Sequence, residues 1–182
     1  MTPTDALKLT LTAAVAVARA IRETLKLNAE IKWPNDVLIG GRKVCGILTE
    51  MSTRGQAVDF VTLGIGINAN VDIETFPENL RASLTSLRKE LKREVDRERL
   101  LQALLEELEN QYKIFIQQGF GQILKEWKSL ATFLGSHVEV AAYDEKISGF
   151  ATDVDHNGAL LIKTKNGIIR KLTSGDVTLQ KH

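Results

Sequence analysis

Two lysines and an aspartate lie close together in a stretch that also contains a pair of glycines, and their charges could hold an anion. Lys32 and Asp36 flank a Trp-Pro-Asn segment, and Lys43 follows Gly40-Gly41. A lysine at the start of an apolar strand either extends its stem over apolar surface, with its charge in water, or binds an anion. The residues alone favour the first alternative, a hairpin with solvated Arg42 and Lys43, and do not distinguish Lys32 from Lys43.

Glycines inside apolar strands mark a second candidate site. Gly46 follows Lys43 in its strand, and Gly64, Gly66 and Asn68 alternate with apolar residues in the next strand. The spacing lacks the third glycine and the following helix of a dinucleotide-binding turn. Two alternatives stay open. The glycines serve close packing, or they form a strand edge against which a flat ligand lies, with the Asn68 amide bonded to a phosphate or sugar.

Other site chemistries fail on spacing. Residues 153–158 resemble the start of a calcium loop, but Thr164 stands where a bidentate glutamate is required, so a β-turn rich in Asp and Asn is the better interpretation. The three histidines and Cys45 form no metal-ligand spacing, and no metal site is expected. Cys45 lies inside an apolar strand, which predicts a buried, inert thiol.

Composition places the chain among soluble globular proteins. It has 182 residues, of which 43% are hydrophobic and 26% charged. The formal net charge of +1 provides no field that would attract nucleic acid or a membrane. A single cysteine fits a reducing compartment, and we find neither a signal peptide nor an apolar run long enough to span a bilayer. We therefore expect a cytoplasmic protein without nucleic-acid or membrane partners.

Periodicity predicts a sheet packed by helices in the first part of the chain. A helix opens at Thr2-Pro3 as cap and first position, and its face is rich in alanine. Strands follow at residues 30–33, 37–39, 44–51 and 58–67, with a hairpin turn at Gly40-Gly41. The last strand is almost continuously apolar, which is typical of burial on both faces. Several strands and a packing helix indicate an α+β fold with a mixed, mostly antiparallel sheet.

Helices and then short strands complete the chain. Residues 70–79 read as a polar loop and candidate lid, and helices are expected at 83–95, 97–118 and 121–131. Asp96 is the expected cap and Gly119 the expected stop of the second helix, whose apolar face would carry Leu101, Leu104, Leu105, Leu108, Tyr112 and Phe115. Five short strands at 137–142, 146–155, 159–164, 168–172 and 177–179 predict a small barrel. The predicted domains are residues 1–133 and 134–182.

Three blocks of the sequence resemble the bacterial and archaeal biotin protein ligases. They are Lys-Trp-Pro-Asn-Asp at 32–36, Gly-Arg-Lys-Val-Cys-Gly-Ile-Leu-Thr-Glu at 41–50, and Gly-Ile-Gly-Ile-Asn at 64–68. Trp127-Lys128, Leu134-Gly135 and Ser174-Gly175-Asp176-Val177 are similar to blocks of that family's SH3-like C-terminal domain. The resemblance implies part of a class II synthetase-like catalytic domain at 1–133 and an SH3-like β-barrel at 134–182.

The resemblance also implies an activity and a biotin site. The family makes biotinyl-5′-AMP from biotin and Mg²⁺-ATP and transfers biotin to a lysine of a carboxylase's biotin carboxyl carrier domain. Lys43 would contact the biotin carboxylate and then the adenylate phosphate. Gly46 and Leu48 would present their backbone to biotin, and Gly64 and Gly66 would form the floor beneath it.

Three further roles follow from the same resemblance. Asn35 and Asn68 would bind the adenylate, together with Lys43. Asp36 would orient or activate the acceptor lysine, since an amine needs a nearby base to lose its proton. The loop at residues 70–79 would fold over the adenine and exclude water.

The family's Gly/Arg-rich biotin loop and its N-terminal DNA-binding helices have no counterpart in the sequence. We therefore expect an N-terminally truncated catalytic domain without a repressor role. One alternative to a ligase is a non-catalytic module that binds biotin, adenylate or the carrier. A weaker one is a lipoate-type acyl ligase. A half-sheet leaves strand edges unpaired, which predicts a homo-oligomer.

Overall fold

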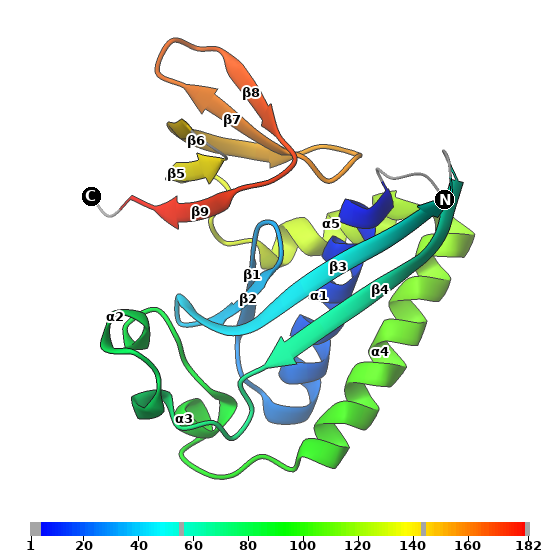
Figure 1. Cartoon of the computed structure of the whole chain (residues 1–182), viewed down its shortest axis with the longest axis vertical. Helices are drawn as coiled ribbons and strands as arrows, with labels where there is room; N and C mark the ends of the chain where they lie inside the picture. Colours follow the sequence, from blue (N-terminus) through cyan, green and yellow to red (C-terminus); the bar gives the residue numbers. More distant parts are fainter. Residues whose placement is uncertain (1–4, 55–56, 143–144, 181–182) are drawn as a thin grey trace.

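The computed structural model describes residues 5–54, 57–142 and 145–180 and contains two antiparallel sheets joined through a layer of helices (Figure 1). Helix α1 (Asp5–Leu25) contacts strands of the first sheet on one side and helices α4 and α5 on the other. The alanines and valines between residues 13 and 20 are almost fully buried, because small side chains allow close approach of both layers. The expected opening of this helix at Thr2-Pro3 lies outside the described residues.

The first sheet has the order β1-β2-β3-β4. Its strands are β1 (Ala29–Lys32), β2 (Asp36–Ile39), β3 (Arg42–Arg54) and β4 (Ala57–Ile67). Gly40 and Gly41 turn the chain between β2 and β3 with φ of +55° and +74°, values at which a side chain would be strained. The predicted hairpin is therefore confirmed. It pairs Lys43 with Leu38 near the end of β2, from where the lysine side chain reaches Asp36 at the start of that strand.

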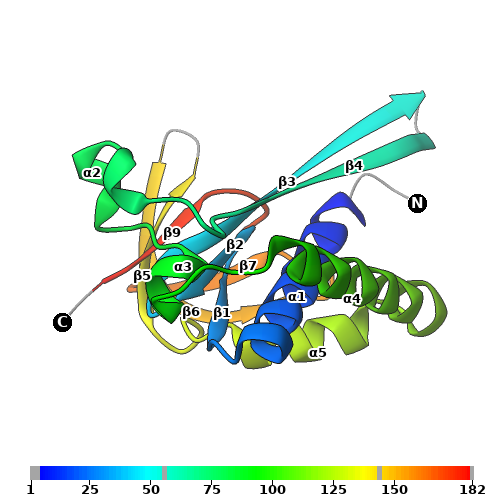
Figure 2. The same ribbon diagram turned by 90° about the horizontal axis from the view of Figure 1, so that it is seen from below.

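Burial of β4 on both faces was a wrong prediction. Strand β4 pairs only with β3 within the described part of the chain, and the side chain of Phe60 is 60% exposed. Figure 2 shows the β3–β4 hairpin extending away from the helices, so little covers its outer half. A continuous apolar run indicates contact with something apolar, but it does not say whether that partner lies within these residues.

The segment after β4 is less helical than predicted. It contains a 3₁₀ turn η1 (Ile73–Thr75) and the short helices α2 (Glu78–Arg81) and α3 (Leu87–Leu91). The helix expected at 83–95 shrinks to five residues, because Ser86 caps its start and Lys92, at φ of +55°, ends it. The chain around α3 is thus largely irregular and takes its shape from its contacts.

Helix α4 (Arg97–Gln118) has the predicted ends, with Asp96 accepting a hydrogen bond from the Arg99 N–H and Gly119 as its C-cap. Its predicted apolar face was only partly right. The buried side chains are Leu100, Leu104, Glu107 and Gln111, whereas Leu101, Leu105 and Tyr112 are exposed. The helix is rotated because an ionic contact with α1 draws Glu107 inward, and a count of apolar residues could not show this.

Helix α5 (Phe120–Leu130) leads to the second sheet. Its strands are β5 (His137–Ala142), β6 (Glu145–Val154), β7 (Leu160–Thr164), β8 (Ile169–Leu172) and β9 (Asp176–Leu179), in the order β8-β7-β6-β5-β9. The five predicted strands are confirmed. Together with the first sheet they confirm an α+β fold with antiparallel pairing in both sheets, and Lys43 and Leu84 form an isolated parallel bridge.

Arg19 ties the three long helices together, and its replacement should destabilise the fold. Its guanidinium lies 2.6 Å from Glu107 on α4 and 3.0 Å from Glu126 on α5. Arg19→Met would leave the nearly buried Glu107 without a cation, so we expect a loss of about 2 kcal/mol in the free energy of unfolding, tempered by partial exposure of Arg19. Urea titration measures it. Glu23→Gln, which removes an exposed partner of the same arginine, should change stability by less than about 0.5 kcal/mol. Equal losses in both variants would contradict the role of Arg19 in linking the three helices.

Candidate functional site

Asp36 lies between two lysines at the end of the first sheet. Its residue is only 7% exposed. Lys43 Nζ stands 2.6 Å from its Oδ1 atom, and Lys32 Nζ stands 3.4 Å from Oδ2. The β1–β2 register places Lys32 directly opposite Asp36. The Lys43 contact is an ion pair whose angles fall outside those of a hydrogen bond, and no other described group bonds Oδ1. The carboxylate is therefore held by charge between two ammonium groups.

A flat groove of about 500 Å³ opens beside this triad. It is lined by Asn35, Gly46, Ile47, Leu48, Gly64, Ile65 and Gly66. The β3–β4 register pairs Gly46 with Gly66 and Leu48 with Gly64, so the predicted floor residues lie on one face of two neighbouring strands. The groove has an apolar lining and ends at Lys43, because a Cβ on Gly46 would be 3.1 Å from the lysine's Cε and Nζ atoms. This shape suits a flat apolar ligand with an anionic end.

The two asparagines expected at the adenylate both hold the chain in place. The Asn35 amide nitrogen donates to the Ile47 carbonyl over 2.8 Å, and Ile47 N–H donates to the Asn35 carbonyl over 2.9 Å. The Asn68 amide nitrogen donates to the Thr85 carbonyl over 3.1 Å. Each side chain thus fixes a loop at the rim of the groove, and a direct contact with adenylate stays a prediction.

Residues 83–90 support Lys43 from the far side. The Lys43 N–H donates to the Ser83 carbonyl over 2.8 Å, and the Thr85 N–H donates to the Lys43 carbonyl over 2.9 Å. Glu90 accepts from Arg42 over 2.7 Å and also pairs with the Thr85 hydroxyl. None of these contacts was expected from the sequence, because those of Lys43 and Arg42 join residues forty or more positions apart and no local pattern marks them.

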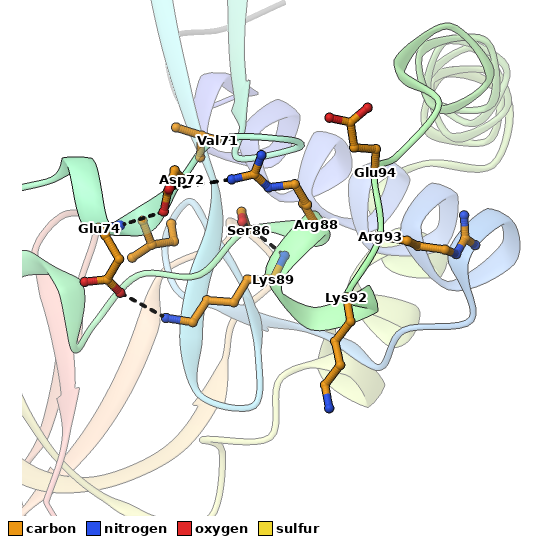
Figure 3. Close-up of a pocket in the computed structure, with 10 residues that line it drawn as sticks. Val71, Asp72, Glu74, Ser86, Arg88, Lys89, Lys92, Arg93 and Glu94 are labelled. Carbon is orange, nitrogen blue, oxygen red and sulfur yellow. Dashed lines mark hydrogen bonds and ion pairs between the residues drawn. The ribbon is translucent and has the colours of Figure 1, made fainter.

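A second hollow, of about 460 Å³, lies between the predicted lid and α3 (Figure 3). Its walls carry opposite charges, with Arg88 3.8 Å from Asp72 and Lys89 3.8 Å from Glu74. The lid is fastened at one end, because the Asn70 side chain exchanges two hydrogen bonds of 2.8 Å with the backbone of Val95. Residues 71–74 of this loop form one wall of a cavity, and closure of residues 70–79 over adenine stays a prediction.

Cys45 takes no visible part in the site. It is buried, as predicted, and burial together with the nearby Asp36 charge raises the pKa of its thiol to about 12. A thiol at that pKa holds almost no thiolate at neutral pH, so it is a poor nucleophile.

The Asp-rich stretch at 153–158 is a turn, as expected. The Asp155 carboxylate accepts the N–H groups of Asn157 and Ala159 over 2.8 and 3.0 Å, and Lys171 Nζ lies 2.6 Å away. Burial opposes ionisation of Asp155, but these contacts outweigh it and hold the pKa of the carboxyl below its usual value. Among the residues that the structure describes, no group of three His, Cys, Asp or Glu side chains could hold a metal ion.

Two family models match the chain. One describes the biotin/lipoate A/B protein ligase family and matches residues 1–68, and the other describes the biotin protein ligase C-terminal domain and matches residues 133–179. The apo structure of biotin protein ligase from Aquifex aeolicus superposes with a TM-score of 0.84 and 30% identity, covering 97% of this chain and 76% of that one. The chain belongs to the biotin protein ligase family.

Other members agree in sequence and in fold. The bifunctional ligase/repressor BirA of Bacillus subtilis is 38% identical over 172 residues, which are 94% of this chain and 53% of the relative. The chain thus spans about half the length of this relative. The Aquifex aeolicus enzyme in complex with biotin and ATP superposes with a TM-score of 0.81, at 29% identity over 97% of this chain and 72% of that one. Within the described ranges, no helix has the length and apolar character to cross a membrane.

Proposed function

We propose that the chain contributes to biotin–protein ligation. Biotin's carboxylate attacks the α-phosphorus of ATP, pyrophosphate leaves, and biotinyl-5′-AMP forms. The amine of a lysine on a biotin carboxyl carrier domain then attacks the acyl carbon, an amide forms, and AMP leaves. The observation that carries the proposal is a single lysine ammonium, Lys43, at the end of a glycine-floored apolar groove and within 2.6 Å of a nearly buried carboxylate.

Each residue has one task in this scheme. Lys43 moves away from Asp36 and binds first the biotin carboxylate and then the adenylate phosphate. A fixed cation at this place stabilises developing negative charge. Backbone at Gly46 and Leu48 and the floor at Gly64 and Gly66 hold the biotin rings. Asp36 accepts the proton that the acceptor amine loses. Asn35 and Asn68 fix the rim, against which the adenylate lies.

Biotin and ATP are substrates, and Mg²⁺ would enter with the ATP phosphates, as this ion commonly does. The described residues do not form a separate magnesium site, because the carboxylate of the groove is paired with two ammonium groups. We therefore assign no step to a metal held by this chain. The match of residues 133–179 to the biotin-specific C-terminal domain favours biotin over lipoate.

The test uses the purified chain with biotin, Mg²⁺-ATP and a carrier domain. We expect the mass of the carrier to increase by one biotinyl group. A non-catalytic binding module is the second candidate, because the groove is open above its floor and Leu48 is 61% exposed. That module would give heat with a biotinyl-adenylate analogue in calorimetry but no mass increase. The absence of both the heat and the mass increase would refute both candidates.

A substitution at Gly46 tests the link between the floor and Lys43. In Gly46→Ala the new methyl would press on the lysine's flexible end, which can move at little cost to stability. We expect adenylate formation to slow by roughly tenfold or more, because small misplacements of a positioned charge are costly. Gly121→Ala is the control, since its methyl would meet nothing within 4 Å. Equal rates in both variants would contradict the placement of Lys43.

We also propose that the chain divides into two domains at 133/134. We propose a cytoplasmic location, which fits the free thiol and both substrates.

We further propose that the chain associates into a homo-oligomer. The edge of β4 that is unpaired among the described residues and the exposed Phe60 support the association, because an uncovered apolar edge recruits further strands. Sedimentation at tens of micromolar, on the order of usual assay concentrations, should show a species larger than the monomer. A single monomeric species would count against it.

A further inference from the structure

The second sheet reaches the candidate site through Lys32. Asp176, the first residue of β9, lies 2.8 Å from Lys32 Nζ, and the same ammonium stands 3.4 Å from Asp36. A chain of four alternating charges therefore runs from the second sheet to the groove, in the order Asp176, Lys32, Asp36 and Lys43. The two carboxylates differ in setting, because the Asp36 side chain is 10% exposed and the Asp176 side chain 72% exposed.

The neighbouring residue fastens the same turn to the second sheet. Trp33 is fully buried, and its Nε1–H donates to the Gly158 carbonyl over 3.0 Å. Gly158 packs in turn on α1, where a Cβ would be 3.1 Å from Leu7. Lys32 at the end of β1 and Trp33 after it are thus held by two separate parts of the second sheet, β9 and the β6–β7 loop, and that sheet lies above them in Figure 1. The position of Lys32 is set by that sheet as well as by its own strand.

Charge balance at Asp36 gives Lys32 a task during the proposed reaction. In this structure Asp36 has two cations nearby. When Lys43 moves to a substrate anion, Lys32 is the neighbouring cation that still balances this nearly buried carboxylate. A buried carboxylate without a cation beside it is costly, so Lys32 would hold Asp36 in place to receive the proton of the acceptor amine.

We propose that Lys32 is a positioning residue that balances the charge of Asp36 and orients its carboxylate during biotin transfer, and that Asp176 of the second sheet holds Lys32 in place. This inference rests on the proposed function. It gives the C-terminal sheet a direct part in the chemistry of the groove. Among the described residues, the charged or titratable groups around Asp36 are Lys32 from β1 and Lys43 and Cys45 from β3, with Asp176 from β9 behind Lys32.

Single-turnover transfer of biotin from preformed biotinyl-5′-AMP to a carrier domain tests the role of Lys32. We expect Lys32→Gln to slow transfer about tenfold, since placing a base contributes at least this much. Its acidic limb should move to higher pH, because one cation fewer favours the protonated carboxyl. Lys32→Arg should recover most of the rate. Asp176→Asn should slow transfer less, and the double variant should match Lys32→Gln if both act along one path.

Lys128→Gln is the matched control. It removes a different ion pair to the second sheet, from Lys128 on α5 to Asp153 over 2.6 Å, and leaves the charges around Asp36 unchanged. Its transfer rate should stay within twofold of that of the unaltered chain, and its pH profile should not shift. Equal effects of Lys32→Gln and Lys128→Gln would overturn the inference, as would an unshifted acidic limb in Lys32→Gln.

An activity-independent readout separates this inference from the proposed function. Carbon-13 NMR of labelled aspartates, with Asp36 assigned by its loss in Asp36→Asn, follows the carboxyl directly. We expect its titration midpoint to move to higher pH in Lys32→Gln and to stay in Lys128→Gln. If the unaltered chain forms no adenylate and transfers no biotin, the proposed function fails, and this midpoint alone decides whether Lys32 controls Asp36. An unmoved midpoint refutes that control.

Discussion

Replacing Lys43 by methionine is expected to slow formation of biotinyl-5′-AMP by about 10²–10³-fold, the usual cost of removing one group that stabilises developing charge. Methionine keeps an unbranched apolar stem over Gly46 and removes only the ammonium. In the structure this ammonium is the cation at the end of the groove. The Lys43 side chain is 40% exposed, so it can rotate from Asp36 to an entering anion. Biotin-dependent exchange of pyrophosphate into ATP measures the step.

The fold should tolerate the change, which keeps the experiment interpretable. Asp36 retains Lys32 at 3.4 Å, so its carboxylate is not left unpaired in the variant. Lys113→Met is a suitable control, because this lysine is 57% exposed on α4 and pairs only with Glu109 among the residues that the structure describes. The control should exchange pyrophosphate at the unaltered rate. A Lys43→Met chain that kept more than a tenth of that rate would show that another group holds the anion.

The arrangement of the groove residues could be predicted from the sequence because they lie on adjacent strands. The glycine turn sets the β2–β3 hairpin, and alternation along β3 and β4 then decides which residues share a face. Gly46, Leu48, Gly64 and Gly66 all line one groove for that reason. The choice of Lys43 over Lys32 as the anion-binding residue came from the family resemblance, since spacing treats the two lysines alike.

Features that depend on distant contacts could not be predicted. Asp176 is 144 positions from Lys32, and no periodicity links a β9 residue to a turn in the first sheet. The exposure of β4 was missed because an apolar run reports the need for a partner and not its presence. The rotation of α4 was missed because Glu107 is nearly buried beside Arg19, whereas pattern rules place glutamate on the outside.

Replacing Asp36 by asparagine should separate the two steps of the proposed reaction. The amide has nearly the shape of the carboxylate but cannot take a proton from an amine, so we expect transfer to the carrier to slow by about 10²–10³-fold. Adenylate formation should slow far less, because Lys43 loses a competitor for its charge. Biotinyl-5′-AMP would then accumulate, and rapid quenching followed by mass analysis of both adenylate and carrier measures the two rates in one experiment.

Stability must be measured beside those rates, because two ammonium groups lose their shared anion in Asp36→Asn. Lys32 keeps Asp176 at 2.8 Å and Lys43 is partly exposed, so both cations retain a partner or water. We expect a loss of about 1–2 kcal/mol in the free energy of unfolding, enough to lower Tm but not to unfold the chain at assay temperature. Asp59→Asn, on exposed β4, controls for loss of one surface charge. If adenylate formation and transfer fell by the same factor, Asp36 would serve mainly to hold Lys43, and the acceptor amine would lose its proton to another group.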